Sequence, residues 1–308
     1  MNFNLNSIKY FISKKHLSLC GLMFVMISSF SQTDSSQEKY IDEIKTFHQK
    51  RITNLKKETG WLNLAGLFLL QEGDNTFGTS TKNKLVFPKG KCPAFAGKLV
   101  LKNKQVSIET KNGVSIWNGK QKISKAIIYK NEEEDPMILQ YKSLRWFVIK
   151  RGNDYYVRLR DLESNNVKTF KDVPTYPIDM NWKVEATLDT TTKNKIEVND
   201  VLGNTNLEES AGTVVFTING ITYRLDALDE GDNLFIIFAD KTNESETYYT
   251  GRFLNANKPD ANGKVYLDFN KATNPPCAFT DFATCPLPPK QNVLTISITA
   301  GEKRFGKH

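Results

Sequence analysis

Histidine is scarce in this chain, and its scarcity excludes several kinds of active site. Only three histidines, His16, His48 and His308, occur among 308 residues. Serine and cysteine hydrolases hold an imidazole rigidly beside the nucleophile, and zinc or non-haem iron sites usually need two or three histidines. His308 is the last residue, where side chains are seldom rigid, and we expect His48 to be a packing residue of a helix. The sequence therefore predicts no catalytic histidine and no metal site.

Nucleotide-binding loops are also absent. The chain contains neither G-x-x-x-x-G-K-[ST] nor a G-x-G-x-x-G between a strand and a helix. Basic residues are mixed with acidic ones and form no aromatic-basic ribbon, so we expect no nucleic-acid binding. We expect no cofactor, and the partner that remains is a small or anionic ligand. The sequence does not define the oligomeric state.

The first 31 residues have the pattern of a secretory signal peptide. A stretch with three lysines precedes an apolar run at residues 17–27, and Ser29-Phe30-Ser31 forms a small-x-small cleavage site. The run is shorter than the roughly 20 residues that cross a bilayer. We therefore expect an exported protein, periplasmic or secreted, with no membrane span after cleavage. A retained anchor and lipidation at Cys20 are the alternatives.

Cleavage would change the charge and the cysteine content of the mature chain. It would remove three lysines and no acidic residue, so 39 basic residues would face 34 acidic ones and the formal charge would fall from +8 to +5. It would also remove His16 and Cys20, and the mature chain would keep Cys92, Cys277 and Cys285. Such a mild positive excess mainly affects solubility and favours acidic ligands weakly.

One helix is expected, at about residues 36–58. Ser35 to Glu38 has the form of a capping box, and Gly60 follows the expected end. Five residues at helical spacing would share one apolar face: Ile41, Ile44, His48, Ile52 and Leu55.

From Trp61 onward the pattern favours short strands. We expect three hairpins, with turns at Asn219-Gly220, Asn112-Gly113 and Arg151–Asp154. Six more stretches alternate like strands: Lys98–Leu101, Ala126–Tyr129, Lys183–Leu188, Leu234–Phe238, Lys264–Phe269 and Val293–Thr299. The fold class predicted is mostly β, with antiparallel sandwich or barrel-like sheets in two lobes and one N-terminal amphipathic helix.

The expected organisation has four parts. Residues 1–31 are the signal peptide and residues 32–60 the helix. Residues 61–180 are an N-terminal sandwich-like lobe, and residues 181–308 are a C-terminal β lobe with a loop rich in cysteine and proline. The join lies near Pro174–Asn181, where two prolines interrupt the strand pattern. One continuous sheet system is the alternative.

The C-terminal third carries the densest pattern of polar residues, prolines and cysteines. Its main runs are Glu246-Thr247-Tyr248, Gly251-Arg252-Phe253, Asp268-Phe269-Asn270, Asn274-Pro275-Pro276-Cys277, Cys285-Pro286-Leu287-Pro288-Pro289, Asn292 and Gly301-Glu302. On these runs, and on Trp61-Leu62, Gly66-Leu67-Phe68 and Arg158-Leu159-Arg160-Asp161 upstream, the chain resembles the DUF1684 family of bacterial proteins. The resemblance covers most of residues 60–302 and implies no established activity.

Cys277 and Cys285 stand eight positions apart in a loop that prolines keep out of any central strand. In an exported chain such thiols oxidise, so we expect a disulfide between them, with Cys92 unpaired. A redox-active pair or a metal site is the alternative.

Polar residues beside these expected strands form the candidate site. As a binding site, Arg252, Asn270, Asn274 and Asp240 would hold a ligand. As a hydrolase, Asp268 or Glu246 would act with Tyr248 and Arg252, and two of the carboxylates could form a glycosidase-type pair. As a structural set, Arg252 would form an internal ion pair with Asp268 or Glu246. The first function expected is a ligand-binding or accessory module; the carboxylate hydrolase and the structural envelope protein are the alternatives, and the sequence does not decide whether the protein is an enzyme.

Four arginines cluster on one expected hairpin: Arg145, Arg151, Arg158 and Arg160. A solvated or salt-bridged strand face is one interpretation, and an anion site is the other.

Overall fold

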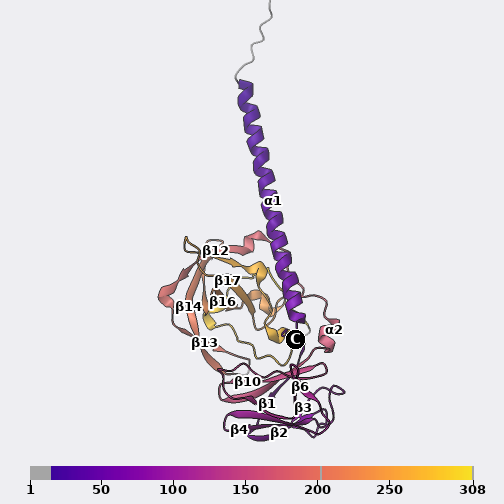
Figure 1. Ribbon diagram of the computed structural model, residues 1–308. Helices are drawn as coiled ribbons and strands as arrows, with labels where there is room; N and C mark the ends of the chain where they lie inside the picture. The colour runs from indigo at the N-terminus through magenta and orange to yellow at the C-terminus, as the bar shows by residue number, and fades with distance from the viewer. Residues whose placement is uncertain (1–14, 202, 307–308) are drawn as a thin grey trace, which may run out of the picture. The chain divides into compact units, whose positions relative to one another are not determined.

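The computed structural model describes residues 15–201 and 203–306 (Figure 1). The chain divides into two compact units, residues 1–47 and 48–308. Helix α1, Lys15–Lys56, begins in the first unit and ends in the second. Across the described ranges, no helix is both long and apolar enough to cross a bilayer.

Helix α1 begins earlier than the sequence predicts. Its backbone is helical from Lys15, so Ser35 and Glu38 lie inside the helix and the predicted capping box is wrong. The run before Ser35 is rich in Leu and Met, which favour helix over other structure. The helix ends at Lys56, and a Cβ at Gly60 would lie 2.2 Å from the Leu55 carbonyl oxygen, so the chain can return this closely only at a glycine. The first 14 residues of the predicted signal peptide, and His308, lie outside the described residues.

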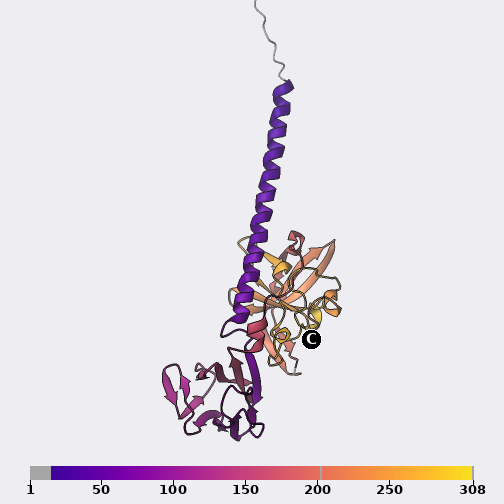
Figure 2. The same cartoon turned by 90° about the vertical axis from the view of Figure 1, so that its right-hand side faces the viewer.

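Residues 48–308 are mostly β, as predicted, and contain three sheets (Figure 2). The early strands form two of them. The six-stranded sheet has the order β1 (Leu64–Leu69), β11 (Asp154–Asp161), β10 (Leu144–Arg151), β9 (Leu139–Tyr141), β6 (Ile116–Asn118) and β7 (Gln121–Ile123). The five-stranded sheet has the order β3 (Leu85–Val86), β2 (Gly73–Gly78), β4 (Gly97–Lys102), β5 (Gln105–Thr110) and β8 (Lys125–Tyr129). Their inner faces share one core around Phe77, Leu99, Trp146 and Val157.

The later strands form a nearly closed barrel. Its order is β17 (Arg252–Asn257), β16 (Asn233–Phe238), β15 (Ile221–Glu230), β14 (Thr205–Ile218), β12 (Lys183–Asp189) and β18 (Lys264–Asp268), with β13 (Lys195–Asn199) paired to β14. The two end strands, β17 and β18, lie beside each other without a hydrogen-bonded ladder. Buried side chains such as Phe216, Leu225, Phe238 and Phe269 fill the interior.

Short helical segments connect these strands and carry some of the candidate site residues. They are α2 (Asn165–Thr169) and the 3-10 turns η1 (Met180–Trp182), η2 (Thr190–Thr192), η3 (Lys241–Glu244), η4 (Phe269–Lys271), η5 (Pro276–Ala278) and η6 (Lys290–Asn292). A separate apolar cluster joins the end of α1 to the cysteine loop. Its members include Leu55, Trp61, Tyr248, Cys277 and Phe279.

Two of the three predicted hairpins are confirmed. Asn219-Gly220 joins β14 to β15, and both residues have the positive φ that a two-residue type I′ turn requires. Arg151 pairs with Asp154 in the β10–β11 hairpin. The Asn112-Gly113 hairpin is wrong, because β5 pairs with β4 and β8 whereas β6 pairs with β7 and β9 in the other sheet.

The strand predicted at Val293–Thr299 is also wrong. This segment forms no ladder; its contacts are single hydrogen bonds, such as Leu294 N to the Ala239 carbonyl at 2.8 Å. All strands up to Asp161 belong to the first two sheets and all strands from Lys183 onward to the barrel. The lobe boundaries themselves stay a prediction.

Candidate functional site

Arg252, the first residue of β17, is fully buried beside Asp240. Its Nη2 donates to Asp240 Oδ2 at 2.7 Å and to the Ile298 carbonyl at 2.9 Å. Its Nη1 donates to the Ala300 carbonyl and, at 3.5 Å, to that of Glu302. The guanidinium thus bonds carbonyls of alternate residues, as a neighbouring strand would, which explains why the segment after Asn292 needs no ladder. The ion pair that Arg252 forms is with Asp240, rather than with the expected Asp268 or Glu246.

Asp240 is held from the opposite side by the turn that it caps. Its Oδ1 accepts from Thr242 N at 2.9 Å, from Thr242 Oγ1 at 2.6 Å and from Ile298 N at 3.1 Å. Neither the Asp240 nor the Arg252 side chain has any exposed surface. A charged pair buried this deeply is tolerable only because its hydrogen-bonding capacity is nearly filled.

Asp268 and Asn270 lie at the end of β18 and fasten the chain before β12. Asp268 caps η4 by accepting from Asn270 N at 3.2 Å, and its Oδ2 lies 3.7 Å from Lys271 Nζ. Asn270 exchanges two hydrogen bonds with the backbone of Asp179, at 2.8 and 3.1 Å. Both residues are buried, and this geometry joins two segments of the barrel.

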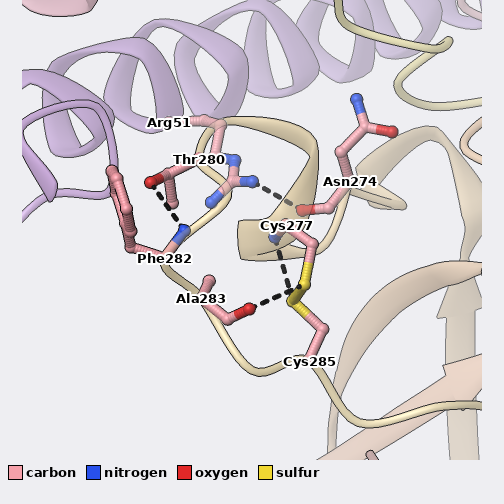
Figure 3. Close-up of a disulfide and its surroundings, with 7 residues drawn as sticks. All are labelled: Arg51, Asn274, Cys277, Thr280, Phe282, Ala283 and Cys285. Carbon is pink, nitrogen blue, oxygen red and sulfur yellow. Dashed lines mark hydrogen bonds between the residues drawn. A yellow bond between two sulfur atoms is a disulfide. The ribbon is translucent and has the colours of Figure 1, made fainter. Parts of the chain in front are cut away.

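Asn274 and Glu302 anchor the cysteine loop to the second half of α1. Asn274 N donates to Glu302 Oε2 at 2.6 Å, and Asn274 Nδ2 donates to the Lys303 carbonyl at 2.8 Å. Arg51 completes this group, since its Nε donates to Glu302 Oε1 at 3.1 Å. Its Nη2 donates to the Asn274 carbonyl (Figure 3), at 2.9 Å. Arg51 and Glu302 were not among the predicted site residues; their separation of 251 positions leaves no sequence signal for the pair.

Tyr248 and Glu246 differ sharply in exposure. Tyr248 is 2% exposed, and burial, with its neighbour Tyr249, raises its pKa above the ordinary value. Glu246 has a half-exposed side chain and lies 3.7 Å from Lys303 Nζ.

Tyr176, which is not among the predicted site residues, lies beside Glu246 and Lys303. Burial and the Glu246 carboxylate raise the pKa of Tyr176 to about 12, and Lys303 Nζ lies 4.4 Å from the centroid of its ring. Both phenols, Tyr176 and Tyr248, are therefore protonated near neutral pH and can donate a proton to a hydrogen bond but not act as bases.

Cys277 and Cys285 form the expected disulfide, and Figure 3 shows the loop that it closes. Cys277 N donates to Cys285 Sγ at 2.9 Å, and Phe282 N donates to Thr280 Oγ1 at 3.2 Å. Outside the loop, Val201 N donates to the Cys285 carbonyl at 3.0 Å. Among the cysteines whose side chains the structure describes, Cys92 is free, and burial raises its thiol pKa to about 11, so little of the reactive thiolate is present at neutral pH.

The remaining predictions concern His48 and metals. His48 is half-buried, and its Nε2 lies 2.8 Å from Asp172 Oδ1. Among the described residues, no three His, Cys, Asp or Glu side chains are grouped so that they could hold a metal ion.

The predicted site residues thus fall into several groups, and the groups of Arg252 and Asn274 meet at Glu302. Arg252 and Asp240 form one, Asp268 and Asn270 a second, and Asn274 with Glu302 a third. Whether any of them binds or transforms a ligand stays a prediction.

Comparison with known proteins gives a family without an activity. No curated protein matches this chain. Among solved structures, the chain is similar to the solution NMR structure of an uncharacterized protein of Haloarcula marismortui, at 32% identity over 44% of this chain and 78% of that one, with a TM-score of 0.37. The model of a family described as a protein of unknown function (DUF1684) matches residues 168–303, which hold all the site groups above except Arg51 and His48. Through this region the chain belongs to the DUF1684 family.

Proposed function

We propose that this protein is a non-catalytic ligand-binding or accessory module, in which the Arg252 group keeps the barrel closed. The observation that carries the non-catalytic, structural part of this proposal is the complete burial of the Arg252–Asp240 pair. A ligand could reach this guanidinium only if the segment at Ile298–Ala300 left the barrel, and two of the arginine's hydrogen bonds hold that segment in place. Arg252 therefore serves the fold.

The hydrolase alternative needs accessible carboxylates. A glycosidase-type mechanism uses two carboxyl groups that face one substrate. Of the three candidates, the Asp240 side chain is fully buried and the Asp268 side chain is 7% exposed. Glu246 alone is open to solvent, and it faces Lys303. This distribution supports a binding or accessory role over carboxylate hydrolysis.

A double-mutant cycle tests the role of the pair. We expect Arg252→Gln and Asp240→Asn each to lower the free energy of unfolding strongly, and the double variant to lose less than the sum, because each single change leaves one buried charge unpaired. Glu246→Gln is the matched control: it removes a half-exposed carboxylate of the same region and should change stability little.

Enzymatic assays test the alternative on the same variants. A panel of ester and glycoside substrates should show no turnover above background with the wild-type chain. Turnover that disappears in Glu246→Gln or Asp268→Asn, while both variants stay folded, would establish the hydrolase instead.

We also propose that the protein is exported. The leader at residues 1–31 supports this. Cell fractionation with mass spectrometry of the mature N-terminus should recover a chain that starts at Gln32 outside the cytoplasm. Recovery of the uncleaved chain in the cytoplasm would contradict export.

A further inference from the structure

The arginines of the β10–β11 hairpin share one face of the six-stranded sheet. Arg145 pairs with Arg160, and Phe147 pairs with Arg158. Side chains alternate along a strand, so residues 145, 147, 149 and 151 of β10 point to the same side as residues 154, 156, 158 and 160 of β11. The opposite side carries Trp146, Val148 and Val157 and belongs to the core.

Two of these arginines have partners that fix them in place. Arg145 Nε lies 2.9 Å from Glu58 Oε1, and its Nη1 donates to the Lys142 carbonyl at 2.8 Å. Arg160 Nη1 donates to Asn63 Oδ1 at 2.8 Å and to the Gly60 carbonyl. Arg145 thus has the salt bridge that one interpretation predicts, whereas Arg160 is held by neutral acceptors.

Arg158 and Arg151 are different. Both are half-buried, and the Nε atom of each is inaccessible to solvent and has no hydrogen-bond partner. Within residues 15–201 and 203–306, no carboxylate forms an ion pair with either guanidinium. Burial, followed by repulsion from Arg151 and Arg160, lowers the pKa of Arg158 to about 10. A cation that is partly removed from water and repelled by its neighbours is unfavourable unless an anion joins it.

One side of the Arg158 guanidinium is covered by an aromatic ring. Its guanidinium carbon lies 5.9 Å from the centroid of the Trp61 ring, and Trp61 packs in the cluster that contains Tyr248 and Cys277. The aromatic ring orients the guanidinium without neutralising its charge. The Nη groups of Arg158, unlike its buried Nε, therefore remain available to an acceptor.

Arg151 lies at a hollow between the β10–β11 hairpin and residues 200–208. Arg151 lines a hollow of about 540 Å³ together with Asp200, Asn204 and Thr205. Val201, which follows Asp200, donates its N–H to the Cys285 carbonyl. Arg158 thus lies over Trp61, and Arg151 shares its hollow with Asp200, the residue before Val201.

We propose that Arg158, assisted by the positive charge of Arg151, binds the oxyanion group of a small ligand: a phosphate, sulfate or carboxylate. A planar guanidinium donates two parallel hydrogen bonds to such a group. Asp154 and Glu208 also line the hollow beside Arg151. These carboxylates would repel an extended polyanion, so the site takes a compact anion that lies toward Arg158 and Trp61. This site is separate from the Arg252 group, and its existence does not depend on the role of that group.

The test is a titration of the full chain with sodium phosphate and with sodium sulfate, using sodium chloride at equal ionic strength as the reference salt. The readouts are intrinsic tryptophan fluorescence, to which Trp61 contributes, and the temperature of unfolding. Citrate supplies the carboxylate arm. We expect at least one of the three oxyanions to bind and to raise the unfolding temperature above that in chloride.

Substitutions assign the binding to Arg158. Arg158→Gln should weaken the oxyanion about tenfold or more, because the charge-assisted hydrogen bonds are lost. It should also leave the anion-free protein at least as stable as the wild type, because it removes an uncompensated charge. Arg151→Gln should weaken binding by a smaller factor. Arg224→Gln is the matched control, since Arg224 lies on the barrel surface paired with Asp189, and it should bind as the wild type does.

Three outcomes would overturn the proposal. One is that phosphate, sulfate and citrate affect the wild-type chain no more than chloride. Another is that Arg158→Gln keeps the wild-type affinity. A third outcome, a clear loss of stability in anion-free Arg158→Gln, would show that Arg158 serves the fold and would also contradict the site.

Discussion

Two arginines, Arg252 and Arg158, show how differently this chain treats the same side chain. Arg252 has no exposed surface, and one carboxylate and three backbone carbonyls accept its hydrogen bonds. Arg158 is half-buried, lies against the Trp61 ring and has other arginines, not acids, as its charged neighbours. The identity of the residue is the same, but the partners supplied by the fold are not.

The difference separates a structural role from a binding role. The Arg252 side chain is closed to solvent and its Nη atoms are bound inside the chain, although its buried Nε has no partner, so it offers a ligand no accessible donor; removing it leaves Asp240 unpaired. A half-buried cation without a carboxylate partner can still bind a ligand, because an anion would neutralise its charge. The C-terminal third, which has the densest sequence pattern, therefore holds the fold together. The β10–β11 hairpin offers the better contact for a ligand.

The largest effect that would sharpen this comparison is expected from Arg252→Ala. The change leaves Asp240 charged and buried, so the free energy of unfolding should fall by about 3–5 kcal/mol. Urea denaturation measures the loss. A loss close to that of Arg224→Ala, a substitution in an exposed pair, would show that the Arg252 group does not hold the barrel.

A backbone test addresses the segment that Arg252 holds. Gly301 and Gly263 both have φ of +76°, but a Cβ at Gly301 would lie 2.6 Å from the Ala272 carbonyl oxygen, whereas nothing lies within 4 Å of one at Gly263. Gly301→Ala should cost about 3 kcal/mol, because backbone strain and a steric clash add. Gly263→Ala should cost about 1 kcal/mol from strain alone. Equal losses in denaturation would mean that the segment is not tightly seated.

The next effect concerns the loop that Cys277 and Cys285 close. Replacing Cys277 and Cys285 by serine should lower the free energy of unfolding by about 2.5 kcal/mol, because the unfolded chain regains the entropy of an open loop. Denaturation of the oxidised wild type and of the double variant measures this difference. Non-reducing peptide mapping provides the control, and two free thiols in the wild type would contradict the disulfide.

The smallest effect concerns pH near the Arg252 group. The pKa of Tyr176 is raised from an ordinary value near 10 to about 12 in the folded chain. The folded state therefore holds this proton more tightly than the unfolded state. The resulting stability is complete below pH 10 and is lost as the pH rises toward 12. Relative to Tyr176→Phe, the wild type should therefore lose stability over this range. Parallel pH curves for the two proteins would contradict the assignment.

Local features of this fold could be predicted from the sequence, and pairings between distant segments could not. The Asn219-Gly220 turn carries its own geometry and the strands that flank it, so its hairpin was predicted correctly. Asn112-Gly113 is the same dipeptide, but its two flanking strands pair in different sheets, a choice made by the cores on either side. Val293–Thr299 has the composition of a strand, yet side-chain donors of Arg252 replace a strand partner there.

The candidate site shows the same limit. The sequence predicts that Arg252 forms an ion pair, but it does not predict the partner. The partner is Asp240, whose carboxylate lies at the start of the η3 turn beside the guanidinium. The four arginines of the β10–β11 hairpin are equivalent in sequence. Glu58 and Asn63 reach two of them from the chain before β1, and nothing in the hairpin itself tells which two remain without partners.

The most direct measurement of the central claim is the unfolding temperature of three proteins, the wild type, Arg252→Gln and Arg158→Gln, each in phosphate and in chloride at equal ionic strength. The account predicts that Arg252→Gln unfolds at a much lower temperature in both salts and keeps the extra stability that phosphate gives. It predicts that Arg158→Gln unfolds no earlier than the wild type in chloride and gains nothing from phosphate. If Arg252→Gln loses the phosphate effect while Arg158→Gln keeps it, the two arginines have been assigned the wrong way round.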